Sequence, residues 1–207
     1  MSKSEELRIE RRTLKGSPVE YKVRTEGGEP IIEGYFAVYD SIYEIAPGMT
    51  ESIAPGAFSD SLSGDIRMLI NHDTTLVVGR SSAHTLDLRD DSHGLWAKAP
   101  VNPKDSAAMD AHARVERGDV SQASIGFDII EEDTEFRDDG SIHWTIRKAK
   151  LFEVSICTFP AYEATNISAR SAERDRIMER KAEAWRTKMK ERLRNYGTET
   201  DHAEEKD

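Results

Sequence analysis

The chain has 207 residues, of which 37% are hydrophobic, and this is enough for one domain with a single core and additional terminal segments. Its formal net charge of −10 argues against a general affinity for nucleic acid or for an anionic membrane surface, so we expect protein partners. A single cysteine, Cys157, excludes an intramolecular disulfide and a cysteine-based zinc site, and the absence of a signal-like or membrane-spanning apolar run predicts a soluble protein that is not exported.

Residues 1–17 mix Glu, Arg and Lys with few apolar side chains, which predicts a flexible N-terminal segment. Residues 18–169 differ, because short apolar or alternating runs recur there between clusters of Gly, Pro, Asp and Asn. This density of strands predicts a mainly β domain with some α structure (α+β), arranged as a barrel or sandwich. The expected strands are Val19–Thr25, Ile31–Tyr39, Ile66–Asn71, Thr75–Val78, Thr85–Leu88, Leu95–Val101, Ala123–Ile130, Ile142–Ile146 and Leu151–Thr158.

One helix is expected to begin at Asn102-Pro103, as an N-cap and a first-turn proline, and to end at Gly118. A second, short helix is expected over Pro55–Leu62. Residues 170–195 combine strong helix formers and many charges with a thin apolar stripe, which predicts a peripheral helix or an assembly arm. The acidic residues 196–207 are expected to be disordered.

Alternation along the expected strands separates the polar side chains from the core. Around Ser124 the apolar residues form one face, and Ser124 and Gly126 form the other. Ser124 is therefore predicted to be an exposed nucleophile, with Gly126 leaving room for a substrate backbone. In the last strand, Glu153 is expected opposite the apolar face, on the side shared by Leu151, Ser155 and Cys157.

A serine hydroxyl needs a base, and a neutral imidazole with a pKa of about 6.5 is the natural one. His72 closes the run Ile66–Asn71, where a strand end could expose its ring, although strict alternation puts it on the apolar face with Ile70. Glu153 is the first choice for the group that orients the imidazole, and Asp73 is the second.

Other polar residues give weaker candidates. Cys157 lies in an apolar strand, where a buried and inert thiol is the usual outcome. Ser121 precedes its strand and suits a turn. The remaining histidines lack the spacing of metal ligands, so no metal or cofactor is expected.

Several motifs occur in order over residues 21–169 and together resemble the HK97-type prohead protease family of tailed phages. They are Gly34–Tyr39, Ile53–Phe58, Leu69–Asp73 with Val78–Arg80, Val120–Phe127 and Glu153–Tyr162. The resemblance implies a serine protease of capsid maturation, related in fold to the herpesvirus assembly proteases, with a closed or partly open β-barrel core, flanking helices and a C-terminal helix. It also implies that His72 is the base, Ser124 the nucleophile and Glu153 the third member.

The resemblance further implies where the protein acts. It is expected inside the procapsid in the host cytoplasm, where it removes the scaffolding segment of the major capsid protein and digests itself; self-association is left open. The herpesvirus relatives bind the oxyanion with an arginine-bearing loop after the third catalytic residue, but residues 158–162 contain no arginine. Arg80 and the backbone N–H groups near Gly126 are the remaining candidates. The alternative function is a non-catalytic scaffold or capsid-assembly protein that uses the helix over residues 170–195.

Overall fold

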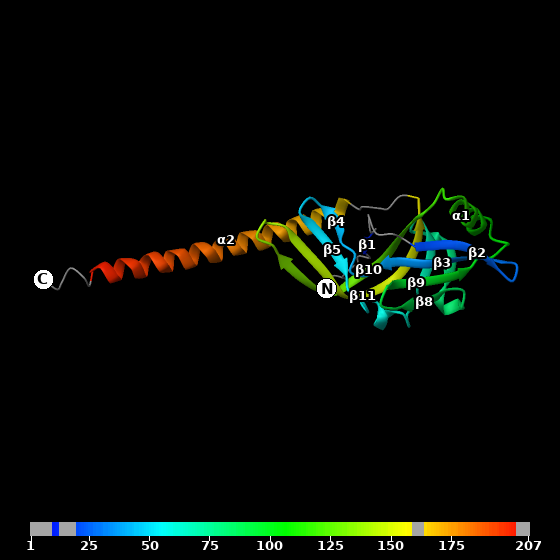
Figure 1. The fold of residues 1–207 in the computed structure, drawn as a ribbon, viewed down its shortest axis with the longest axis horizontal. Coiled ribbons are helices and arrows are strands. Elements are labelled where there is room, and N and C mark those ends of the chain that lie inside the picture. Colours follow the sequence, from blue (N-terminus) through cyan, green and yellow to red (C-terminus); the bar gives the residue numbers. More distant parts are fainter. Residues whose placement is uncertain (1–9, 13–19, 159–163, 202–207) are drawn as a thin grey trace, which may run out of the picture. The chain divides into compact units, whose positions relative to one another are not determined.

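The computed structural model describes residues 10–12, 20–158 and 164–201 (Figure 1). Its elements form two units, residues 1–163 and 164–207. Among these described residues, the first unit holds eleven strands, the helix α1 and two short 3-10 helices, η1 and η2, and the second holds the helix α2. No helix of the described ranges is both long and apolar enough to cross a membrane. The bounds are β1 Glu10–Arg12, β2 Glu20–Glu26, β3 Glu29–Val38, β4 Tyr43–Ala46, β5 Met49–Ile53, η1 Ser59–Ser61, β6 Arg67–Ile70, β7 Asp73–Arg80, η2 Ser81–Ala83, β8 Asp87–Asp90, β9 Gly94–Pro100, α1 Ser106–Arg117, β10 Gln122–Phe136, β11 Ile142–Cys157 and α2 Ala164–Asp201.

The larger sheet is built around the long antiparallel hairpin of β10 and β11 (Figure 1). β1 pairs with β10 on one side. On the other side β11 is flanked by two strands placed end to end: its first half pairs in parallel with β5, and its second half pairs in parallel with β6. β4 extends the sheet beyond β5, and β7 extends it beyond β6.

The smaller sheet has the order β2-β3-β9-β8 and is antiparallel throughout. One apolar core joins the two sheets, since Phe36 of β3 and Leu95 of β9 belong to the same buried cluster as Phe127 of β10 and Val154 of β11. α1 contacts β2, β3 and β7. The strands of the described residues thus form two packed sheets within an α+β fold, and no ladder among them closes a barrel.

The expected strands are present, with differences that have local causes. The last two expected strands form one strand, β11, and three further strands occur at β1, β4 and β5. α1 is capped by Asp105, whose carboxylate accepts from the backbone N–H groups of Ala107 and Ala108, and not by Asn102. Gly118 ends the helix with a φ of 83°, as expected. The short helix expected over Pro55–Leu62 is reduced to the single turn η1.

Near both ends of the chain the structure contains more regular secondary structure than expected. α2 is longer at both ends than the range 170–195. β1 lies within the N-terminal segment that was expected to be flexible. The rest of that segment, and the end of the acidic tail from residue 202, lie outside the described residues.

A bulge in β11 changes which side chains face the core. Gly126 is paired with Glu153 and the next residue, Phe127, with Leu151, so Phe152 is the extra residue. Leu151 consequently joins the core cluster, while Phe152 is only half-buried. The expectation that Leu151 shares a face with Glu153 is therefore wrong, because alternation does not continue through a bulge.

Candidate active site

His72 lies in the tight turn between β6 and β7. Ile70 pairs with Asp73, so Asn71 and His72 are the two central residues of the turn, and their φ angles are 52° and 61°. Two positive φ values are the signature of the type I′ turn, for which asparagine is a favoured first residue. The turn resolves the conflict with strict alternation, because the extended backbone ends before His72 and no longer decides which way its side chain points.

Bonds from β11 and the residue after it hold this turn in place. The backbone N–H of Asn71 donates to the carbonyl of Ile156 at 2.9 Å, and the side-chain oxygen of Asn71 accepts from the N–H of Thr158 at 2.9 Å. The backbone N–H of His72 donates to the hydroxyl of Ser155 at 3.3 Å. The position of the imidazole is therefore fixed relative to β11, the strand that carries Glu153.

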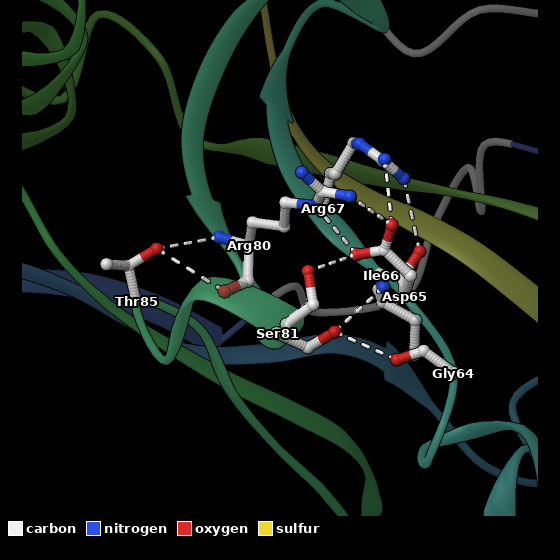
Figure 2. A network of polar contacts seen from close by, with 8 residues as sticks. Gly64, Asp65, Ile66, Arg67, Arg80, Ser81 and Thr85 are labelled. Atoms are coloured by element: carbon white, nitrogen blue, oxygen red, sulfur yellow. Dashed lines mark hydrogen bonds and ion pairs between the residues drawn. The ribbon is translucent and has the colours of Figure 1, made fainter.

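The base of the same hairpin is anchored by a network around Asp65 (Figure 2). Arg80 donates to both carboxylate oxygens of Asp65, at 2.8 and 2.6 Å, and Arg67 and Ser82 donate to the same carboxylate. These bonds, that of Arg80 first, hold the pKa of Asp65 well below its usual range. Because Arg80 serves Asp65 in this way, the geometry does not support it as the oxyanion donor.

The imidazole of His72 and the carboxylate of Glu153 form a short buried contact. Nδ1 lies 2.6 Å from Oε1, and the two residues are 8% and 6% exposed. An ionised carboxylate only accepts hydrogen bonds, so the proton of a neutral imidazole lies on Nδ1 and leaves Nε2 as the acceptor. Among the described residues Nε2 has no hydrogen-bond partner. It is the nitrogen that a general base would use.

Ser124 shares a sheet face with Glu153. Ser124 pairs with Ser155 and Gly126 with Glu153, without a register shift between them, and side chains of paired residues lie on the same side of a sheet. A Cβ on Gly126 would lie 2.6 Å from Oε1 of Glu153. The space above Gly126 is thus filled by the carboxylate, and not left for a substrate backbone as expected.

The prediction that Ser124 is exposed is wrong, since its exposure is 0%. Alternation placed it correctly on the face opposite the core, but both faces of the sheet are covered at this point. The edge of β10 beside it is also paired, since β1 places Arg12 opposite Ile125 and Arg11 opposite Gly126.

Comparison with known proteins identifies the class of chemistry. The model of the caudovirus prohead serine protease family matches residues 17–180. The prohead protease of Enterobacteria phage HK97 is 33% identical over 162 residues, which are 76% of this chain and 68% of that protein. The chain belongs to this family. It is a serine protease of the kind that matures phage capsids.

A solved structure is also similar to this protease. The bacteriophage T4 capsid assembly protease matches with a TM-score of 0.46 and 13% identity, over 73% of this chain and 98% of that one.

The structure also places the weaker candidates of this protease. Asp73 accepts from the backbone N–H and the hydroxyl of Thr75, at 2.8 and 2.6 Å, so it stabilises its own turn while Glu153 contacts His72. Cys157 is fully buried, and burial above all raises the pKa of its thiol to about 12, which opposes formation of the reactive thiolate. Ser121 lies exposed just before β10.

Metal chemistry has no candidate ligand set in this part of the protease. Over the described ranges, no three His, Cys, Asp or Glu side chains gather as a metal site would require.

Sequence reasoning offered Ser155 only as an alternative nucleophile and did not predict its hydrogen bonds within the site. Its hydroxyl donates to Oε2 of Glu153 at 2.5 Å and accepts from the backbone of His72. Alternation already put Ser155 on the side of Glu153, two residues further along the strand. That spacing was the available signal, because nothing else marked a serine in an apolar strand as a hydrogen-bond partner.

Proposed function

We propose that this protease is a serine endopeptidase in which Ser124 is the nucleophile, His72 the general base and Glu153 the orienting carboxylate. The observation that carries the proposal is the 2.6 Å contact between Nδ1 of His72 and Oε1 of Glu153, located on the sheet face that bears Ser124. The contact commits one ring nitrogen to a carboxylate and leaves the other to take a proton, which is the arrangement of a serine-protease triad.

The reaction is acyl transfer. Ser124 Oγ attacks the peptide carbonyl while Nε2 of His72 takes the hydroxyl proton, and the imidazolium is stabilised by Glu153. His72 then gives this proton to the departing amine. Water, deprotonated by the same nitrogen, attacks the acyl-enzyme, and His72 then returns the proton to Ser124 Oγ as the acid is released.

The substrate of the proposed reaction is the phage coat. The protease acts on the major capsid protein inside the procapsid, which assembles in the host cytoplasm, and removes its scaffolding segment. It also cleaves copies of itself. Family membership and the HK97 relative, which is named a prohead protease, support this substrate class. Complete burial of Ser124 further implies that the described conformation is closed, since a peptide carbonyl must reach Oγ.

Co-expression with the capsid precursor of the same phage tests the proposal. Mass spectrometry of the products should find a truncated capsid protein and fragments of the protease. Ser124→Ala should abolish both, because loss of the nucleophile lowers the rate by on the order of 10⁴-fold or more. Ser121→Ala is the matched control: it removes an exposed hydroxyl only three residues away and should leave processing intact.

A serine-reactive phosphonate supplies a second measurement. It should label Ser124 in the unaltered protein and leave Ser124→Ala unlabelled. Cleavage that survives Ser124→Ala would show that another residue is the nucleophile. A protein that neither cleaves the precursor nor reacts with the phosphonate in the assembled procapsid would restore the alternative of a non-catalytic scaffold.

A further inference from the structure

Ser155 joins the two residues that prepare the nucleophile. It lies in β11, is fully buried, and its Cα is paired with that of Ser124 on the neighbouring strand. Its hydroxyl contacts both remaining members of the site, the carboxylate of Glu153 at 2.5 Å and the backbone N–H of His72 at 3.3 Å. One hydroxyl group therefore connects the turn that holds the base to the carboxylate that orients it.

Hydrogen accounting fixes the role of each bond. A hydroxyl has one proton to donate and two lone pairs that accept. An ionised carboxylate can only accept, so the proton of Ser155 lies on the bond to Oε2 of Glu153, and a lone pair receives the N–H of His72. The proton of Ser155 is thus committed to a carboxylate and not to the imidazole. Ser155 is therefore not a candidate nucleophile.

Both bonds act on the geometry of the base. With Oε2 held by Ser155, the carboxylate cannot rotate freely, and Oε1 stays directed at Nδ1 of His72. A hydrogen bond to an ionised acceptor is short and roughly twice as strong as a neutral one. The second bond ties the backbone of His72, which has a φ of 61°, to the same strand.

We propose that Ser155 is a positioning residue of the catalytic site, which holds the carboxylate of Glu153 and the backbone of His72 in register with each other. This inference rests on the proposed triad. Ser155 does not touch the substrate; it acts through its two partners.

Kinetics of Ser155→Ala test the positioning role. Loss of the bond frees the carboxylate to rotate, and displacement of a catalytic group by about 1 Å can cost 10²-fold, so kcat should fall by about 10- to 100-fold with KM unchanged.

Two further variants separate the hydroxyl from the volume at this buried position. Ser155→Thr keeps the hydroxyl, and Ser155→Val introduces a side chain of almost the same size as threonine but without a hydroxyl. We expect the threonine variant to recover most of kcat and the valine variant to resemble Ser155→Ala. Equal kcat values for these two variants would overturn the inference, since packing alone would then explain every effect.

NMR spectroscopy supplies a measurement that does not require turnover and can therefore be applied to variants with low activity. In a Ser124→Ala background, the proton of His72 Nδ1 should resonate far downfield because of its short bond to Glu153, and it should move upfield in the valine variant but not in the threonine variant. An unchanged resonance in both contradicts the role of Ser155. Persistent cleavage by Ser124→Ala would instead contradict the proposed triad, so the two failures are distinguishable.

Discussion

Gly126→Ala gives a sharp test of the site because the three atoms nearest to a methyl group there all belong to Glu153. The added Cβ would lie 2.6 Å from Oε1, 2.9 Å from Cγ and 3.0 Å from Cδ of Glu153. The backbone itself accepts alanine, since Gly126 is not among the glycines with positive φ. The substitution therefore displaces the carboxylate that contacts His72, while leaving the strand intact.

The size of the displacement follows from the distances. Ordinary contact begins at 3.4 Å, so the 2.6 Å approach requires Oε1 to move by at least 0.8 Å. A displacement near 1 Å predicts a loss of about 10²-fold in kcat, or about 2.7 kcal/mol of transition-state stabilisation. Complete loss of the orienting carboxylate, worth about 10⁴-fold in serine proteases, sets the upper limit. The stability cost should stay within the 1–3 kcal/mol usual for overpacking.

Kinetics of a peptide substrate, together with urea unfolding, measure both quantities. Gly27→Ala is the control, because it strains a turn with a φ of 60° at a cost of about 1 kcal/mol and contacts nothing within 4 Å. It should lose stability without losing kcat. In a Glu153→Asp background the shorter carboxylate leaves position 126, so Gly126→Ala should cost much less there. Equal costs in the two backgrounds would refute the contact as the cause.

Three other outcomes are expected. Cys157, with a thiol pKa raised to about 12 by burial, should resist iodoacetamide at about pH 8 until the protein is unfolded, and stoichiometric labelling of the folded protein would contradict this. Asp65→Asn should lower the melting temperature most above about pH 4 and least in acid. The reason is that a carboxylate whose pKa is depressed by Arg80 stabilises the fold above its unfolded pKa and loses this effect as it protonates. A loss of melting temperature that does not depend on pH would argue against the ion pair. Asn71→Gly and Asn71→Ala both lose the bond to Thr158, but only the alanine is strained at a φ of 52°. Urea unfolding should therefore find the alanine variant less stable than the glycine variant by about 1–2 kcal/mol. Equal stabilities of the two variants would contradict the turn geometry.

Alternation predicted the polar face of β10 correctly because that strand is regular where it matters. From Gln122 to Gly126 the register with β11 has no shift, so side chains alternate as the simple rule requires. The rule failed at Leu151, two residues from the end of the regular stretch at Glu153, because the extra residue Phe152 between them reverses the faces. Nothing in the local sequence marks such a bulge, because it depends on the pairing of two distant segments.

β5 was missed for a different reason. Its sequence, Met-Thr-Glu-Ser-Ile, is mostly polar, yet both Glu51 and Ser52 are buried. Thr50 and Ser52 contact the two ring nitrogens of His143 on β11, at 2.9 and 3.0 Å. Thr50 and Ser52 are thus satisfied across the sheet, and hydrophobic patterning cannot reveal partners that lie about 90 residues further along the chain.

The position of His72 depends on a parallel pairing that no short turn dictates. A hairpin sets its own register through the turn, whereas parallel strands are joined by long connections that leave the register open. Here β6 pairs with β11 so that Arg67 lies opposite Glu153 and Leu69 opposite Ser155. Asp65 holds Arg67 and Arg80 at the base of the β6–β7 hairpin, and Asn71 bonds the chain beyond β11 at its tip. A one-residue slip would move His72 by about 3.3 Å and break its contact with Glu153, so the residues that fix the register are as necessary to the proposed chemistry as the triad itself.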